Sequence, residues 1–152
     1  GFNLTAYDVV AAGQIPYTNS FHQLTEEHQA VIHWAISLCG LKQHQHKLTS
    51  ELSDGLFQKT IIAKALAQRT PVLLLDEPSA FLDYASKHEL FLLLKKLVME
   101  EQKCVLVSSH DLDLLLTYCH KLLVVDDGKT ELINVKDARN NPAFMKIGGG
   151  FI

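Results

Sequence analysis

Two adjacent carboxylates, Asp76 and Glu77, stand directly after an apolar run at residues 72–75, which is a position suited to chemistry. In an open α/β sheet, ligands lie outside the carboxyl ends of the strands, so polar residues that follow a strand are candidates for a site. Because successive side chains on an extended segment point in opposite directions, the two acids are not equivalent. We therefore expect Asp76 to hold Mg2+, directly or through water, and Glu77 to polarise an attacking water. The alternative is that the two acids simply open a loop or cap a helix.

Two other short segments contain residues that could join them. His110 follows a second apolar run, at residues 104–107, although a lone histidine is more often a structural hydrogen-bonding residue. Ser53 and Gly55 stand at the start of a predicted helix, where free N–H groups, a hydroxyl and close backbone approach can form an anion site. A simple N-cap explains Ser53 equally well. Asp54 opposes phosphate binding unless Mg2+ or a lysine offsets its charge, because its carboxylate satisfies the same N–H groups and repels an anion.

A phosphate-binding loop of the form G-x-x-x-x-G-K-[ST] does not occur in this sequence. The nearest match is the segment Gly128-Lys129-Thr130, which has Leu123 where the first glycine should stand. Asp126 and Asp127 precede it and would repel phosphate. We interpret this segment as a turn.

The pattern of apolar and capping residues predicts helices in the first part of the chain and alternating strands and helices after it. Helices are expected at residues 5–13, 25–40, 53–68, 86–100 and 112–119, and strands at 72–75, 104–107, 122–125 and 130–133. This order predicts an α/β fold with right-handed crossovers and a parallel sheet. Because the first strand is apolar at every position, we expect it to be covered on both faces.

Composition limits the classes of function. The 152 residues have a formal net charge of -3, which gives no electrostatic footprint for nucleic acid or an anionic membrane surface. Three widely spaced cysteines indicate neither a disulfide framework nor a zinc site, which fits a reducing cytosol. No apolar run approaches the length that crosses a bilayer, so we expect any membrane role to go through a partner.

As an ordered set, these segments resemble the second half of the ATPase subunit of ABC transporters. Residues 52–56 align with the signature sequence LSGGQ of that family, residues 72–77 with its Walker B strand, residues 79–83 with its D-loop, and His110 with its switch histidine. Residues 8–16 further resemble the helical subdomain of importers for iron-siderophores, haem and cobalamin. The similarity extends over about residues 4 to 128.

The resemblance implies a partial P-loop NTPase (RecA-like) parallel sheet, preceded by an ABC-type α-helical subdomain. It divides the chain into a helical subdomain at residues 1–70, which includes the signature helix, and the C-terminal part of the catalytic subdomain at residues 71–152. The chain would be a C-terminal fragment without the Walker A P-loop and the Q-loop glutamine. We expect such a fragment to be inactive alone.

The resemblance also implies roles at the subunit's own nucleotide. The cofactors would be ATP and Mg2+. Asp76 would serve Mg2+, Glu77 would be the general base, and His110 would contact the γ-phosphate.

A further set of residues would act on the ATP of a second ATPase subunit, paired head to tail with this one. Ser53 and Gly55 of the signature would bind the γ-phosphate, and Asp83 would reach across the dimer. Asp54 replaces a residue of the glycine type, and Leu56 replaces the signature glutamine. We therefore predict a variant signature with weakened polar contacts.

The function that follows is an ATP-hydrolysing subunit of an importer for an iron-siderophore, haem or cobalamin. It would dock onto transmembrane permease subunits and be cytoplasmic, peripheral on the inner face of the cell membrane, with no nucleic acid partner. One alternative is a soluble ABC ATPase of the DNA-repair type, which should have a long coiled-coil insertion and basic patches. Another is a regulatory ABC subunit with a degenerate site and no turnover.

Overall fold

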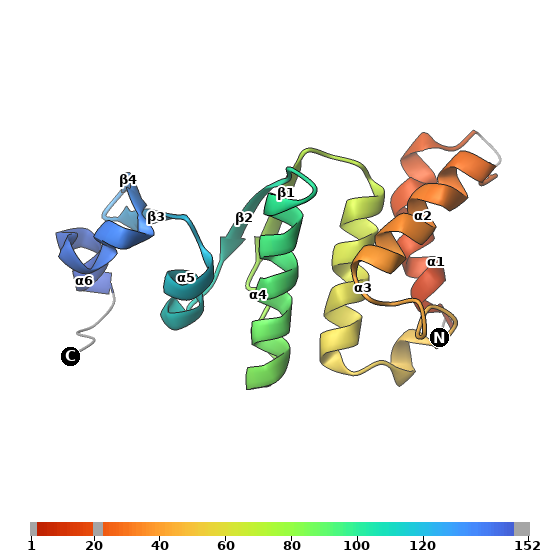
Figure 1. Cartoon of the computed structure of the whole chain (residues 1–152), viewed down its shortest axis with the longest axis horizontal. Coiled ribbons are helices and arrows are strands. Elements are labelled where there is room, and N and C mark those ends of the chain that lie inside the picture. Colours follow the sequence, from red (N-terminus) through yellow and green to blue (C-terminus); the bar gives the residue numbers. More distant parts are fainter. Residues whose placement is uncertain (1–2, 20–22, 148–152) are drawn as a thin grey trace. The chain divides into compact units, whose positions relative to one another are not determined.

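The computed structural model describes residues 3–19 and 23–147 (Figure 1). The chain divides into two compact units, with the boundary between Val107 and Ser108. The first unit therefore contains the helical part of the chain together with the first strand and the helix that follows it. The division at residue 70 between two subdomains stays a prediction.

The elements follow the predicted order of helices first and alternating strands and helices afterwards. In the first unit they are α1 (Ala6–Ala11), the 3-10 helix η1 (Ala12–Tyr17), α2 (Glu26–Leu38), η2 (Thr49–Glu51), α3 (Asp54–Ala67), β1 (Val72–Asp76) and α4 (Tyr84–Met99), followed by β2 (Cys104–Ser108), which ends at the boundary. The second unit contains α5 (Leu112–Tyr118), β3 (Lys121–Asp126), β4 (Lys129–Asn134), η3 (Val135–Asn140) and α6 (Pro142–Ile147).

Side chains that cap the helix N-termini fix where the helices begin. Thr5, Thr25 and Ser53 are the N-caps of α1, α2 and α3, as predicted. The predicted start of α4 at Ser86 is wrong, because Asp83 is the N-cap and its side chain accepts a hydrogen bond from the Ser86 backbone N–H. An aspartate three residues upstream can satisfy that N–H group, so the helix begins one turn earlier.

Gly13 has a different role from the helix end that the sequence suggested. It is buried within η1, and a Cβ atom built on it would lie 2.3 Å from the backbone oxygen of Lys64 in α3. The neighbouring Gln14 side chain donates a hydrogen bond to the backbone oxygen of Ala67, and Tyr17 Oη donates to that of Gln68 at 2.6 Å. The glycine therefore lets η1 approach the backbone of α3 closely.

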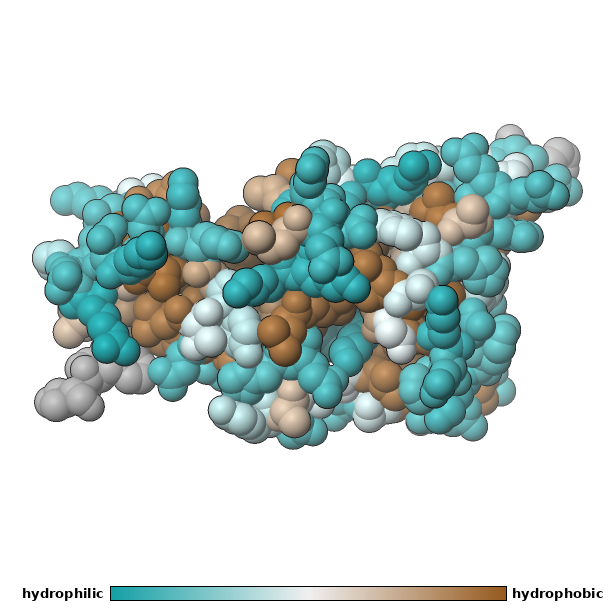
Figure 2. Space-filling model, in the orientation of Figure 1, coloured by the Kyte–Doolittle hydropathy of each residue, from teal (hydrophilic) through white to brown (hydrophobic). Residues whose placement is uncertain are grey.

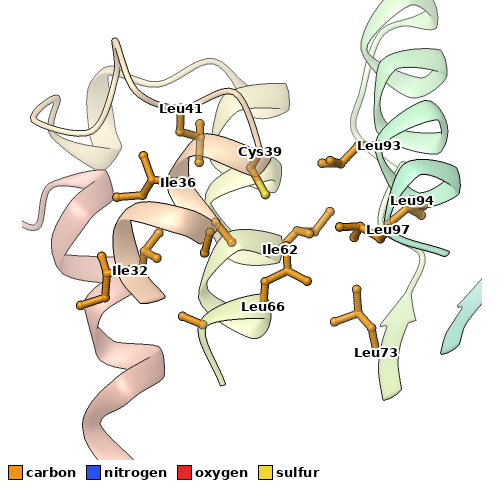
Figure 3. Close-up of a cluster of buried hydrophobic side chains, with 14 of the residues drawn as sticks. Ile32, Ile36, Cys39, Leu41, Ile62, Leu66, Leu73, Leu93, Leu94 and Leu97 are labelled. Carbon is orange, nitrogen blue, oxygen red and sulfur yellow. The ribbon is translucent and has the colours of Figure 1, made fainter. Parts of the chain in front are cut away.

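The core of the first unit forms where α3 separates the other helices from β1 and α4. On one side of α3, buried side chains of α1 and α2 pack against it. On the other, Ile62 and Leu66 of α3 face Leu73 of β1 and Leu97 of α4 (Figure 3). Ile62 and Leu97 are both fully buried. This continuous cluster holds β1, and thus the acids at its end, against the helix that carries the signature residues.

The strands form two sheets in the part of the chain that the structure describes. β1 pairs with β2 in the parallel sheet, and β3 pairs with β4 in an antiparallel hairpin with the register Leu122↔Ile133 and Val124↔Glu131. The turn expected at Gly128, whose φ is +75°, joins the two strands of this hairpin. The α/β fold class and the parallel sheet are thus confirmed, while β3 belongs to the hairpin sheet.

The expected covering of β1 on both faces is wrong for this chain. Leu73 is 5% exposed, but its neighbour Leu74 is 69% exposed, and Leu106 of β2 is 52% exposed. Figure 2 shows several brown apolar areas that reach the surface between hydrophilic side chains. The helices of the first unit cover one side of the strand pair, so alternate apolar residues on the strands face outward.

The capping box at the start of α1 gives a first testable prediction. The Thr5 hydroxyl accepts a hydrogen bond from the Asp8 N–H, and this hydroxyl and the Thr5 backbone N–H both hold the pKa of Asp8 below its ordinary 3.8. We expect Thr5→Ala to lower the stability by about 1 kcal/mol at pH 7. Because a lowered pKa stabilises the fold above the unfolded value, this loss should shrink as the pH falls below 3.8.

Urea unfolding at pH 7, pH 5 and pH 3 measures this difference. The matched control is Thr25→Ala, because Thr25 caps α2 in a box whose partner at the third position is His28 and not a carboxylate. The cost of the control substitution should not change between pH 5 and pH 3. A Thr5→Ala loss that stays constant down to pH 3 would contradict the prediction.

Candidate nucleotide site

The signature residues occupy the N-terminal end of α3. Ser53 is the N-cap, and its side chain accepts a hydrogen bond from the Leu56 N–H at 3.4 Å. Asp54 lies in the first turn and is exposed, while Gly55 and Leu56 are half-buried. The N-cap interpretation of Ser53 is therefore confirmed, while the anion site at this helix N-terminus stays a prediction.

Asp76 and Glu77 lie where β1 ends, but they do not share an extended backbone. Asp76 is the last residue of the strand and is exposed, whereas Glu77 is half-buried and has φ of 43°. A non-glycine residue with positive φ is uncommon and is found preferentially at functional sites. The difference between the two acids therefore arises from a turn of the chain at Glu77, and not from the strand alternation on which the prediction relied.

The turn that begins at Glu77 is held by buried residues and backbone hydrogen bonds. The Ala80 N–H donates to the Glu77 carbonyl oxygen at 3.2 Å, and the Leu82 N–H donates to that of Ser79 at 3.2 Å. Pro78 is buried and Ser79 is 2% exposed. The backbone on which the Glu77 side chain stands is thereby fixed.

Asp83 ends this turn and starts α4. Its carboxylate accepts from the Ser86 backbone N–H at 2.8 Å, and this bond, together with one from the Ser86 hydroxyl, holds the pKa of Asp83 below its ordinary value. The side chain is exposed and ionised at neutral pH. A contact of Asp83 across a dimer remains a prediction, and any such contact would share the carboxylate with the cap.

His110 belongs to the second unit and follows β2 by two residues. It is exposed, and the neighbouring Asp111 backbone N–H donates to Ser109 Oγ at 3.0 Å, which orders the segment before α5. Asp76, Glu77 and Asp83 belong to the first unit, as do the signature residues. The role of His110 toward a γ-phosphate stays a prediction.

The acids at the end of β1 fit a hydrated Mg2+ ion. Within residues 3–19 and 23–147, no group of three or more His, Cys, Asp or Glu side chains could hold a metal. Mg2+ does not need such a group, because it keeps several waters and binds through one or two carboxylates and the phosphates of a nucleotide. An exposed carboxylate at the end of a strand, as at Asp76, suits this mode of binding.

Two features of the site had no signal in the sequence. The positive φ of Glu77 was not predicted, because glutamate has no preference for the left-handed region. The close approach of Gly55 to Ser86 joins residues that are distant in sequence, and a Cβ built on Gly55 would lie 3.1 Å from Ser86 Oγ. The only hint of that approach was a glycine in the first turn of a helix.

The parallel sheet that follows the helical part of the chain has the fold of part of a P-loop NTPase cassette. The chain belongs to the ABC transporter family, whose model matches residues 4–80.

Relatives of known sequence include several ATP-binding subunits. The chain is 42% identical over 127 residues to an uncharacterized ABC transporter ATP-binding protein of Methanocaldococcus jannaschii. The aligned residues are 84% of this chain and 44% of that protein. It is 34% identical to an iron(3+)-hydroxamate import ATP-binding protein of Bacillus subtilis, over 82% of this chain and 46% of that one. It is 38% identical to a cobalamin import ATP-binding protein of Halobacterium salinarum, over 84% of this chain and 32% of that protein. The chain thus spans half or less of the length of these relatives.

Solved structures show the same fold. An ABC transporter in an inward-facing conformation matches with a TM-score of 0.89 at 22% identity, over 97% of this chain and 59% of that chain. The dimeric structure of a bacterial ABC transporter cassette matches with a TM-score of 0.69 at 26% identity, over 87% of this chain and 57% of that chain. Among the described residues, no helix is both long and apolar enough to cross a membrane.

Proposed function

We propose that this chain is the C-terminal part of an ATP-hydrolysing subunit that energises an ABC importer for an iron-siderophore, haem or cobalamin. The observation that carries the proposal is the arrangement at the end of β1, where an exposed acid precedes a half-buried acid on a fixed turn. The names of the relatives from Bacillus subtilis and Halobacterium salinarum favour these cargoes.

The residues of this chain divide the work at the subunit's own ATP. Asp76 would hold a hydrated Mg2+, which would supply positive charge against the phosphates. Glu77 would accept a proton from the water that attacks the γ-phosphorus, as the bond to the β–γ bridging oxygen breaks and ADP leaves. His110 donates a hydrogen bond to the γ-phosphate. The half-buried position of Glu77 limits the number of waters around its carboxylate, so that one water can be oriented.

Other residues of the chain act on the ATP of a second ATPase subunit. Ser53, Gly55 and the N-terminal end of α3 face the γ-phosphate held by that subunit, where the positive end of the helix dipole favours an anion. Asp54 adds a negative charge at the same place, and Leu56 offers no polar side chain. Part of the favourable interaction is therefore lost relative to the LSGGQ sequence. The solved dimer of a related cassette supports a homodimer for the full-length protein.

Outside the ATPase pair, the subunit would dock on transmembrane permease subunits through its helical part. We propose a cytoplasmic location, peripheral on the inner face of the cell membrane, as for the ATPase subunit of an importer. The net charge of -3 supports a protein partner over nucleic acid.

The proposal predicts different behaviour of this chain and the full-length protein toward ATP. The 152 residues contain no G-x-x-x-x-G-K-[ST] loop, and without its N–H groups and lysine the phosphates lack their main ligands. Isothermal calorimetry should therefore detect negligible binding of Mg-ATP to the 152-residue chain, while the full-length protein binds and hydrolyses it. Micromolar affinity of the chain alone would contradict this division, and a full-length protein without turnover would favour the regulatory subunit.

A further inference from the structure

The N-terminal parts of α3 and α4 are in close contact. A Cβ atom built on Gly55 would lie 3.1 Å from Ser86 Oγ and 3.3 Å from Ser86 Cβ, so a side chain at residue 55 would be crowded against Ser86. One turn further along both helices, Lys59 Nζ lies 2.8 Å from Glu89 Oε2. Because both contacts pair residues in ascending order, α3 and α4 run in the same direction where they touch, and they stand side by side in Figure 1.

Lys59 is placed to act more strongly than an ordinary surface charge. Its side chain is 22% exposed, whereas the side chain of Glu89 is 63% exposed. Burial raises the pKa of the Cys39 thiol to about 12, and the charge of Lys59 opposes that rise. Burial of most of Lys59 reduces the solvent screening on its side of the pair, while the exposed Glu89 carboxylate keeps the attraction modest.

We propose that Lys59 is a positioning residue, which through its ion pair with Glu89 fixes the first turn of the signature helix against α4. The inference rests on the proposed function. It states that the Lys59–Glu89 ion pair fixes the position of the α3 N-terminus relative to the α4 N-terminus. Ser53 is the cap of one terminus and Asp83 is the cap of the other. When the pair is intact, both caps are presented together to a second subunit.

The energetic consequence follows from geometry. Phosphate binding at the α3 N-terminus needs hydrogen-bond distances, so a displacement of the first turn weakens every contact to the γ-phosphate at once. A misplacement of about 1 Å can cost about 100-fold in rate, and loss of a single ion pair causes a smaller displacement. We expect removal of either charge to raise the ATP concentration needed for half-maximal dimer formation by about 10-fold.

The test uses two measurements on Lys59→Gln, Glu89→Gln and the reversed pair Lys59→Glu with Glu89→Lys. Amide hydrogen exchange on the 152-residue chain should be faster at residues 54–59 in the single variants and should return to the original rate in the reversed pair. Light scattering on the full-length protein, in a Glu77→Gln background that slows hydrolysis, should show the 10-fold change in ATP dependence for the single variants and recovery to within about 2-fold for the reversed pair.

Lys96→Gln is the matched control. Lys96 lies on α4 and pairs with Glu100 at 3.8 Å within the same helix, so its loss should change neither measurement. Single variants that behave like Lys96→Gln, or a reversed pair as impaired as the single variants, would overturn the positioning role. If the unmodified Lys59 protein formed no ATP-dependent dimer in the Glu77→Gln background, the proposed function itself would fail, and the inference with it.

Discussion

A Glu77→Gln variant of the full-length protein is expected to bind Mg-ATP normally and to hydrolyse it about 100- to 10,000-fold more slowly. The amide has the shape of the carboxylate but cannot accept a proton from water. The turn should survive the change, because Pro78 and Ser79 are buried and the Ala80 N–H still donates to the backbone oxygen of residue 77. The lost rate should therefore appear in kcat, while the dissociation constant for Mg-ATP stays the same.

The measurement is steady-state phosphate release together with equilibrium ATP binding on the same preparation. Glu100→Gln serves as the matched control, since Glu100 lies at the far end of α4 and is exposed. Its kcat should equal that of the unmodified protein. Unchanged turnover in Glu77→Gln would exclude Glu77 as the general base.

Gly13→Ala is expected to destabilise the fold by about 3 kcal/mol, at the upper end of the range for overpacking. The added methyl group would lie 2.3 Å from the Lys64 backbone oxygen and 3.0 Å from Ala67 Cβ. Backbone cannot rotate away as a flexible side chain can, and α3 is held on its other side by Ile62 and Leu66. Either η1 must move off α3, with loss of the Gln14 hydrogen bond, or the helix must shift within the core.

Gly40→Ala separates crowding from backbone conformation. Gly40 has φ of +71° and no atoms within 4 Å of a built Cβ, so alanine there should cost about 1 kcal/mol through strain alone. Urea unfolding of the 152-residue chain measures both variants. A Gly13→Ala loss no larger than that of Gly40→Ala would show that η1 does not depend on close contact with α3.

Local rules were enough to predict most of the elements. Thr5, Thr25 and Ser53 each provide a hydroxyl that caps the following turn, so the helix starts could be found without any tertiary information. The acids after β1 could be assigned to a site because an apolar run followed by charge indicates a strand that ends at a polar edge.

The features that were not predicted depend on contacts distant in sequence. An apolar run shows that a strand can be buried on both faces, but the exposure of Leu74 depends on which helices cover the sheet. The choice between Ser86 and Asp83 as the start of α4 depended on which residue the chain brings to the cap, and both are good capping residues. The turn at Glu77 is held by the burial of Pro78 and Ser79, which periodicity does not reveal.

The two hydrophobic clusters have a consequence for how stability is measured. One cluster joins α1 to α4 with β1, and the other joins the β3–β4 hairpin to η3 and α6. Trp34, the only tryptophan of the sequence, packs against the first cluster. Its fluorescence therefore reports melting of the first unit, where Thr5, Gly13 and Gly40 lie, whereas calorimetry sums the heat of both. Because the two-state relation applies to one cooperative unit, a stability obtained from tryptophan fluorescence refers to the first cluster.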